Sequence, residues 1–514
     1  MYNPIYPMKI RLQFLSLLFV ASSLWADVHI SISTPETWSA QELAQYVGQT
    51  VIFDSPMVVC GNANGNYVVS PWRRFEPLCQ GVVGSESYNT TVRINNHCMF
   101  NLSNVSNYHR CGEKIYTLRA NVSSTNNLTF LDGNWSGNTR TELESGIPDL
   151  GDYRLLICGF NLENYFMTLG SMGAQTDAKR QIQRQKVNKA LKRINADIYG
   201  LVELQQGDEA IAEIVADLNK NLPERNYQYF HDAASGTFQK VDYVYDANTV
   251  APISHSPAET NVEVQNRKKM MCFTEISTGE KFIYSINHFK AMNTGDEGRR
   301  VNEAKAVIKL YNSYRQASSV RDKDILIMGD LNCYAFTEPI KVFTDNGFID
   351  MHRAFHADSS YSYMFGGMAS YIDHAIANGT MYRQVTGMAG YHINSDEDDY
   401  YTYDKSGNSS MFRCSDHDPV LVGLKLDSTL LYDPTPQINS MEIIRGDSEK
   451  LTIYNAHQEG KESYYAIYTT SGVLKEQKEI TSVSFEVTLP REAGIYIVYI
   501  YYDGQVYQRK MIVR

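Results

Sequence analysis

The sequence lacks several features that would assign it to a familiar class. After its first 26 residues it has no apolar run long enough to cross a bilayer, and it has neither a GxSxG elbow nor a CxxC pair. Positive charge is scarce: 47 Lys and Arg face 58 Asp and Glu, which leaves a net charge of −11. This balance excludes retention on nucleic acid or anionic membranes by bulk charge, although it leaves room for a local basic groove. With 43% apolar and 20% charged residues the chain is not disordered as a whole, and 514 residues predict about three domains.

The N-terminus has the pattern of an export signal. Lys9 and Arg11 precede an apolar run over residues 12–24, and Ala26 offers a small residue for cleavage before Asp27. An apolar run of about 13 residues is too short to span a bilayer stably. Residues 1–26 are therefore predicted to be a signal peptide, with Met8 the better start, and the mature protein to be secreted or held on the surface of a bacterial cell. A buried N-terminal helix is the alternative.

Export makes disulfides permissible in the part of the chain that follows. Four cysteines fall before residue 120, and they allow three pairings among which the sequence does not choose: Cys60, Cys79, Cys98 and Cys111. We expect two disulfides there. The other four lie in strand-like or motif contexts and are expected to be small buried residues: Cys158, Cys272, Cys333 and Cys414.

Three segments of the sequence differ in their predicted secondary structure. Residues 27–150 hold short β-prone runs broken by Gly, Asn and Pro, which predicts a β-rich domain that an oligonucleotide/oligosaccharide-binding (OB) barrel would fit. Residues 151–430 alternate apolar strands with amphipathic helices such as 177–195, which is typical of an α/β domain. After the stiff linker 433–436, residues 437–514 read as a small β-sandwich.

Polar clusters follow or lead the predicted strands of the middle segment. They are GFNLEN, GLVELQ, INHFK, MGDLN, YIDHA and CSDHDP. A single Asp at a strand end is usually a turn former, but six such clusters in one domain predict a shared crevice. Carboxylates, amides and imidazoles together suit hydrolysis assisted by Mg²⁺ or Ca²⁺ with a His–Asp general base.

These strings, in this order, resemble the endonuclease/exonuclease/phosphatase superfamily, which includes pancreatic-type deoxyribonuclease. The resemblance spans about residues 153–426 and is strongest to secreted bacterial nucleases, through NHFKA, GDLNCYAFTEPI, YIDHAIAN and FRCSDHDPVLVGL. It implies a two-sheet α/β sandwich with helices on the outer faces, flanked here by the N-terminal β domain and the C-terminal β-sandwich. One departure concerns specificity, because Phe365-Gly366-Gly367 stands where the nucleases usually have FDG.

The resemblance also implies roles for particular residues. His417 is expected to activate water, oriented by Asp416, and His288 to stabilise charge on the phosphoryl oxygens. Asp330 and Asn332 are expected to position the scissile phosphate and the water. The implied metal residues are Glu203, Asn161 and Asp373, and the expected ion is Mg²⁺ or Mn²⁺, with Ca²⁺ a further candidate. The expected phosphate contacts are Arg267, Arg299 and Arg300.

Three other clusters have plainer interpretations. The basic residues of helix 177–195 favour a solvated outer face over a DNA contact. His352 and His356, with Asp350, have the spacing of a zinc pair, but a surface helix turn is the preferred interpretation. The acidic run 396–399 lacks the Gly and Glu of an EF-hand loop, and a solvated loop is expected there.

The sequence therefore predicts an exported, metal-dependent phosphodiesterase, an endonuclease that hydrolyses DNA, with RNA as a further candidate substrate. Two alternatives remain: a sphingomyelinase-like phospholipid phosphodiesterase or phosphatase of the same superfamily, and a non-catalytic surface binding protein built on a decayed nuclease domain. The C-terminal 70-odd residues, from TTSGVLKEQ to RKMIVR, resemble the sorting domain of type IX-secreted proteins, which implies contact with secretion machinery or the cell surface.

Overall fold

The computed structural model of the 514-residue chain describes most of it after residue 26. The described ranges are 27–32, 40–63, 66–73, 75, 98–137, 140–170, 172–232, 236, 238–255, 267–292, 296–317, 319–320, 322–356, 359–402, 410–427, 442–445, 450–454, 463–469, 473–480, 484–502 and 505–513. The predicted signal peptide, Cys79 and the linker 433–436 lie outside them. Within these ranges, no helix combines the length and the apolar character needed to cross a membrane.

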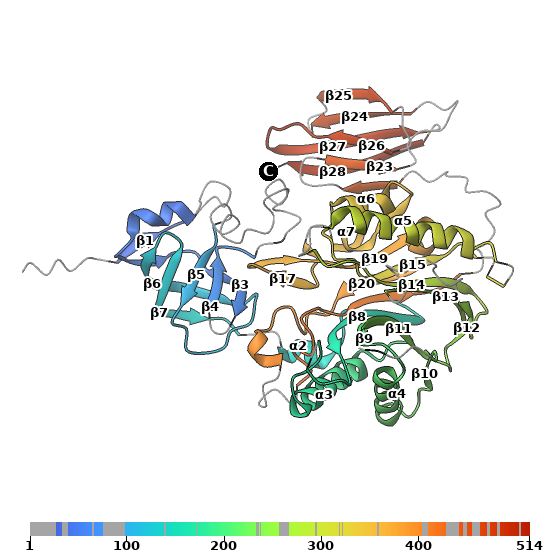
Figure 1. Ribbon diagram of the computed structural model, residues 1–514. Coiled ribbons are helices and arrows are strands. Elements are labelled where there is room, and N and C mark those ends of the chain that lie inside the picture. The colour runs from blue at the N-terminus through green and yellow to red at the C-terminus, as the bar shows by residue number, and fades with distance from the viewer. Residues whose placement is uncertain are drawn as a thin grey trace, which may run out of the picture.

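Two six-stranded sheets face each other in the middle of the molecule (Figure 1). The first sheet, in spatial order, contains β10 (Tyr227–Tyr229), β11 (Gln239–Asp246), β9 (Ile198–Gln205), β8 (Leu155–Tyr165), β21 (Val420–Leu424) and β20 (Val385–Gly390). The second contains β12 (Val250–His255), β13 (Lys268–Glu275), β14 (Lys281–His288), β15 (Ile325–Asp330), β19 (Asp373–Asn378) and β16 (Phe348–Asp350). This is the predicted two-sheet α/β sandwich.

The central strands are apolar on both faces because both faces are covered. All six residues of β15 are buried, and the first eight of β8 are too. Ile157, Val202, Tyr284 and Met328 pack in the core between the sheets. Even the backbone approaches closely there, since a Cβ on Gly200 would lie 2.2 Å from Tyr284 Oη. A continuous apolar run, rather than an alternating one, is the signature of such doubly covered strands.

Helices cover the outer faces, as expected. Helices α3 (Asp177–Ile194) and α4 (Glu209–Asn221) pack on the first sheet, and α5 (Glu297–Tyr314) and α6 (Glu338–Thr344) on the second. Thr176 caps α3 by accepting a hydrogen bond from Lys179 N, and Asn195 ends it in the left-handed conformation. The short helices are α2 (Arg140–Ser145), α7 (Met351–His356) and α8 (Gly379–Tyr382).

The N-terminal strands form a sheet that closes on itself. Its strands are β1 (Val28–Ile30), β2 (Thr50–Phe53), β3 (Met57–Ala63), β4 (Asn66–Ser70), β5 (Phe100–Ser103), β6 (Lys114–Ser124) and β7 (Asn127–Trp135). Because β7 pairs with both β5 and β6, the pairing runs β6-β3-β4-β5-β7 and back to β6. We call this unit the N-terminal barrel; the 3-10 helix η1 (Ala40–Tyr46) lies before β2.

The C-terminal strands form two further sheets. One contains β22 (Glu442–Arg445), β23 (Lys450–Tyr454) and β26 (Ser484–Thr488), and the other β25 (Leu474–Glu479), β24 (Ser463–Thr469), β27 (Gly494–Tyr502) and β28 (Gln505–Val513). The last two strands pair antiparallel with Tyr502 opposite Gln505, as a hairpin at 503–504 requires.

The expected disulfides are not found among the described cysteines. Cys60, Cys98 and Cys111 are buried in or beside the N-terminal barrel without a disulfide between them, while Cys79 lies outside the described residues. The Cys60 thiol donates instead to the carbonyls of Val58 and Trp72. The prediction of two disulfides therefore lacks support, because two bonds among the four cysteines would need at least one between these three. The three side chains pack in an apolar core instead. The four later cysteines are small buried residues, as predicted.

Candidate active site

Neighbouring strand ends bring the chemical groups together at one edge of the sandwich. In the second sheet His288, the last residue of β14, is in register with Asp330, the last residue of β15, and Asp330 is opposite Asp373 on β19. Gly329 permits this close pairing, because its φ is +118° and a Cβ would lie 2.1 Å from Asn287 O. The first sheet contributes Glu203 from β9.

Three of these side chains form a candidate metal centre. Ligand atoms of Glu203, His288 and Asp330 all lie within 4.8 Å of one another. His288 Nε2 is 3.7 Å from Glu203 Oε1 and 3.7 Å from Asp330 Oδ2. Burial, together with neighbouring carboxylates, raises the pKa of Glu203 and raises that of Asp330 to about 7. Clustered carboxylates are unfavourable without a cation, so this donor set fits a hard divalent ion.

Asparagines hold the carboxylates in place. Asn161 Nδ2 donates to Asp330 Oδ2 at 3.1 Å, and Asn332 N donates to Asp330 Oδ1 at 2.9 Å. The backbone N–H of Asn164 donates to Glu203 Oε2 at 2.9 Å. Glu203 and Asn332 both have positive φ, +64° and +47°, the kind of backbone strain that clusters at functional sites.

The expected orienting partner of His417 has to be corrected. His417 Nδ1 hydrogen-bonds Asp373 Oδ2 at 2.7 Å, and Ser362 Oγ donates to the same oxygen at 2.7 Å. Asp416, the expected partner, lies on the other side of the ring, with Oδ1 3.8 Å from Nε2. Asp373 thus belongs to a His–Asp pair and not to the metal cluster, because its carboxylate is already engaged by His417 and Ser362.

The pKa values of His288 and His417 are shifted in opposite directions. Burial lowers the pKa of His288 well below its usual value, and Arg267 adds to the effect. Burial alone would lower the pKa of His417 too, but the Asp373 and Asp416 carboxylates outweigh it and raise that pKa well above the usual value. His417 Nε2 faces Asp330 Oδ2 at 4.0 Å. A cation beside Asp330 would oppose the protonated form of this ring.

A cleft of about 440 Å³ opens over these groups. Arg267 and Lys290 line the cleft. Arg267 Nε donates to the His288 carbonyl at 3.0 Å, so this arginine lies in the cleft, as its expected contact with a phosphate requires. Arg299 and Arg300, on α5, are not among the described residues that line the cleft. Arg300 is buried and donates to the carbonyls of Lys290 and Ala291, and Arg299 Nε is 3.4 Å from Glu303 Oε1. The structure therefore does not bring Arg299 and Arg300 to the cleft, and their role as phosphate contacts stays a prediction.

The histidine pair at 352 and 356 is neither exposed nor arranged as a metal site. His352 is fully buried, with Nδ1 on Ser360 Oγ at 2.6 Å and Nε2 on the carbonyl of Asp373 at 2.8 Å. His356 Nε2 contacts the Met388 carbonyl. The surface-turn interpretation was wrong because α7 packs against β19 and β20, and His352 supports the backbone of Asp373.

Three of the four residues of the acidic run, 396–398, are buried, contrary to expectation, and only Asp399 is exposed. Asp396 pairs with Arg73 and Arg110, and Glu397 pairs with Arg110 and Arg140. The two carboxylates are 2% and 0% exposed. We call residues 396–399 the acidic loop. It contacts Arg73 and Arg110, which lie beside strands of the N-terminal barrel, and Arg140 on α2. All three arginines lie at least 250 residues earlier in the chain.

The basic helix α3 is only partly solvated. Arg180 and Arg184 pair with Glu213 and Asp217 of α4, which neutralises much of that face. Lys186 is buried and donates to the carbonyls of Tyr401 and Phe412.

Lys290 and Tyr363 are among the cleft residues that sequence reasoning missed. Lys290 stood in the NHFK string and could have been found there. Tyr363 had no signal, since it sits on the three-residue strand β17 (Tyr363–Phe365), which pairs with β18 (Met368–Ser370). Its ring lies 4.9 Å from that of His417.

A carboxylate–imidazole cluster that could hold a divalent ion lies beside a carboxylate-held histidine, in an open cleft that Arg267 and Lys290 also line. This combination suits the hydrolysis of phosphoesters. Residues 159–417 match the Endonuclease/Exonuclease/phosphatase family. That is half of the chain, and the protein belongs to this family, whose members are phosphoester hydrolases and typically depend on a divalent metal.

Several solved structures are similar to part of this chain. An endonuclease/exonuclease/phosphatase from Bacteroides vulgatus is 16% identical, covering 53% of this chain and 99% of its own, with a TM-score of 0.38. A mannosyl-6-phosphatase from Bacteroides thetaiotaomicron is 15% identical over 53% and 100%, with a TM-score of 0.37. The human Nocturnin catalytic domain, with a bound sulfate, is 11% identical over 53% and 94%, with a TM-score of 0.38. A search of curated proteins found no match.

Proposed function

We propose that this protein is a metal-dependent nuclease that hydrolyses phosphodiester bonds in DNA, with RNA as the second nucleic acid to test. The observation that carries the proposal is the His417–Asp373 pair, with Nε2 of the ring turned toward Asp330 of the metal cluster. Arg267 and Lys290 in the same cleft supply positive charge for a phosphate.

Each group has a defined task in this proposal. Glu203, His288 and Asp330 would hold Mg²⁺ or Mn²⁺, and Ca²⁺ is a further candidate. The ion would stabilise charge on the non-bridging phosphate oxygens. Asp373 keeps the proton of His417 on Nδ1, so Nε2 is the atom that accepts a proton from water. The water oxygen then bonds to phosphorus, the bond to one ester oxygen breaks, and that oxygen leaves as an alcohol after taking up a proton.

The proposal includes export, with a signal peptide at residues 1–26 and a domain order of 27–150, 151–430 and 437–514. We propose that the C-terminal sheets serve sorting or surface attachment, which rests on the sequence resemblance alone.

The test is a substrate panel. The purified chain is incubated with linear and circular DNA, RNA, sphingomyelin vesicles and a sugar phosphate, each with Mg²⁺, Mn²⁺, Ca²⁺ or EDTA. We expect cleavage of nucleic acid that EDTA abolishes. His417→Ala should reduce it by about 10²–10⁴-fold. His231→Ala should not, because His231 is an exposed histidine that pairs with Asp208 and is not among the residues that line the cleft. Hydrolysis confined to sphingomyelin or the sugar phosphate would replace the proposal with the corresponding activity.

A further inference from the structure

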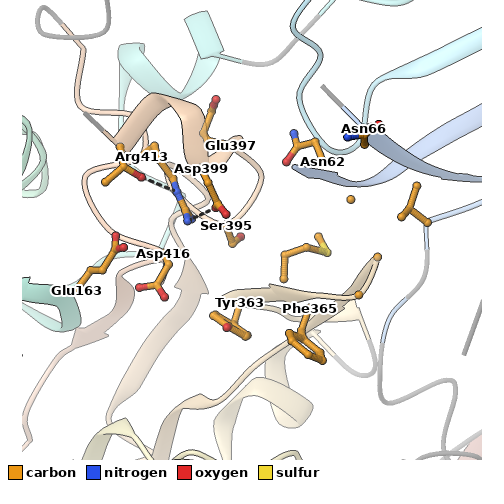
Figure 2. Close-up of a pocket in the computed structure, with 16 residues that line it drawn as sticks. Asn62, Asn66, Glu163, Tyr363, Phe365, Ser395, Glu397, Asp399, Arg413 and Asp416 are labelled. Atoms are coloured by element: carbon orange, nitrogen blue, oxygen red, sulfur yellow. Dashed lines mark hydrogen bonds and ion pairs between the residues drawn. The ribbon is translucent and has the colours of Figure 1, made fainter. Parts of the chain in front are cut away.

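A second cavity, of about 660 Å³, adjoins the catalytic cleft where the sandwich meets the N-terminal barrel (Figure 2). Asn62 and Asn66 line it from β3 and β4 of the barrel, and Glu163, Arg413 and Asp416 line it from the sandwich. The barrel thus forms one wall of a space that begins at the active site.

The cavity and the catalytic cleft share the hairpin strand β17. Tyr363 and Phe365 line both spaces, and Asp416, which lines the cavity, lies 3.8 Å from Nε2 of His417. A phosphodiester with its phosphorus beside His417 would therefore extend one of its two ester groups across β17 into the cavity. The chemistry of this lining bears directly on which substrates fit.

The lining disfavours a second phosphate. Glu163, Asp399 and Asp416 contribute carboxyl groups to it, whereas the carboxylate of Glu397 is buried in its ion pairs with Arg110 and Arg140. Arg413 is the single cation of the lining among the described residues. Arg413 is already engaged, since it pairs with Asp399 and its Nε lies 3.3 Å from Thr402 Oγ1. The barrel wall adds amides and glycine but no charge. An anionic group here would approach the carboxylate of Asp416 without an unpaired cation among the described lining residues, whereas the catalytic cleft offers Arg267 and Lys290.

The same lining suits an uncharged aromatic group that carries polar edges. Phe365 is 38% exposed, and Tyr363 lies two residues away on the same strand, so their rings offer flat apolar surface for stacking. Glu163 Oε2 is buried without a hydrogen-bond partner in the described part of the chain, so a donor on the ligand would satisfy it. Side-chain amides such as that of Asn66 are typical partners for a base or a sugar hydroxyl.

We propose that this cavity is a subsite for one uncharged terminal nucleoside next to the scissile phosphate, and that it rejects a further phosphate. The enzyme would then act at the ends of nucleic acid chains, with the N-terminal barrel as part of its specificity. This inference rests on the proposed nuclease function.

The test compares three forms of one single-stranded DNA sequence: linear with hydroxyls at both ends, linear with phosphates at both ends, and circular. With Mn²⁺ present, we expect the hydroxyl-ended form to be degraded about tenfold faster than the phosphate-ended form and about 100-fold faster than the circle. Equal rates on the circle and the hydroxyl-ended form would overturn the subsite while leaving the nuclease in place. Hydrolysis of none of the three would overturn the proposed function, and the subsite with it.

A charge placed in the barrel wall gives an independent readout. Asn66→Arg should raise the rate on the phosphate-ended form, relative to the hydroxyl-ended form, by about tenfold. The matched control is Asn134→Arg, an exposed asparagine of the same barrel on β7, which is not among the residues lining the cavity. It should keep the wild-type ratio. An equal change in both variants would mean a general charge effect and would overturn the assignment.

Discussion

His417 is surrounded by carboxylates that act on it differently. Asp373 fixes Nδ1 through a 2.7 Å hydrogen bond, while Asp416 and Asp330 lie 3.8 and 4.0 Å from Nε2 without binding it. Only the first contact sets the orientation of the ring. We therefore expect Asp373 to be a positioning residue whose loss affects turnover rather than substrate binding.

Asp373→Asn tests this division. The variant keeps the shape of the side chain but removes the charge that favours Nδ1–H, so we expect kcat to fall by about 10²–10⁴-fold with KM changed by less than about threefold. The melting temperature, followed by circular dichroism, should stay within a few degrees of the wild type. Ser362→Ala, which removes only one donor to Asp373, should cost about tenfold or less. A rise in KM with unchanged kcat would show that Asp373 serves binding instead.

Asp322 provides a pH-dependent stability signal far from the cleft. Burial raises its pKa to about 7, while its Oδ1 accepts the backbone N–H of Asp324 at 2.8 Å. The folded state therefore holds this proton more tightly than the unfolded state, so stability present below about pH 4 is lost as the pH rises toward 7.

Asp322→Asn keeps the acceptor and removes the ionisation. It should have little effect on the free energy of unfolding at pH 4 and should raise it at pH 8 by up to roughly 4 kcal/mol relative to the wild type. Urea unfolding at both pH values measures the difference. A gain that is the same at the two pH values would rule out ionisation of Asp322 as its source.

At the scale of elements, the acidic loop connects the N-terminal barrel to the catalytic histidine. Arg110 of the barrel binds Asp396 and Glu397, and a few residues before them Asn394 donates from Nδ2 to the His417 carbonyl at 2.6 Å. Ser395 N and Asn394 N both donate to Asp418, next to His417. Residues 394–397 therefore contact His417 and Asp418 through Asn394 and Ser395. The same segment binds Arg110 of the barrel through the next two side chains.

Arg110→Met should be strongly destabilising, because it leaves two buried carboxylates with fewer partners. We expect a loss of about 3–5 kcal/mol in the free energy of unfolding, with a fall in kcat from the loosened His417 loop. Arg119→Met is the matched control, since Arg119 pairs with Asp27 and Asp132 at the surface and its loss should have little effect on the free energy of unfolding. Equal losses in the two variants would mean that the buried ion pairs with the acidic loop stabilise the fold no more than the surface pairs of Arg119 do.

The elements that were predictable are those with strong local signals. The runs that became β8, β9, β14 and β15 are apolar on both faces, and α3 begins and ends within a residue of its expected bounds. The polar strings that follow these strands led to Glu203, His288 and Asp330 for the same reason. Such features depend on neighbours in the chain.

Features that depend on distant partners were not predictable. Asp416 is adjacent to His417 in sequence, but the pairing of β15 with β19 brings Asp373 to the ring instead. The acidic loop looked solvated because its arginines lie in another part of the chain. Tyr363 was missed since a three-residue strand leaves no periodic pattern to detect.

At the scale of the whole molecule, the net charge of −11 counts Glu203 and Asp330 as ionised. Burial and repulsion from neighbouring carboxylates make the ionised form of both side chains unfavourable. Glu203 and Asp330 face each other around His288 in a desolvated space. This cluster should lower the stability of the metal-free fold, and an ion that binds only the folded state should raise it by mass action.

Calorimetric or fluorescence melting in EDTA and in Mn²⁺ measures this linkage directly. An ion at about 100 times its Kd should stabilise the wild type by roughly 2.7 kcal/mol, a rise in Tm of several degrees. Glu203→Gln removes one of the charges, so it should melt above the wild type in EDTA and respond little to Mn²⁺. Glu209→Gln, an exposed residue at the start of α4, should keep the full response. Because no turnover is involved, a Glu203→Gln variant that still gained the full shift would place the ion elsewhere, even in a fully active enzyme.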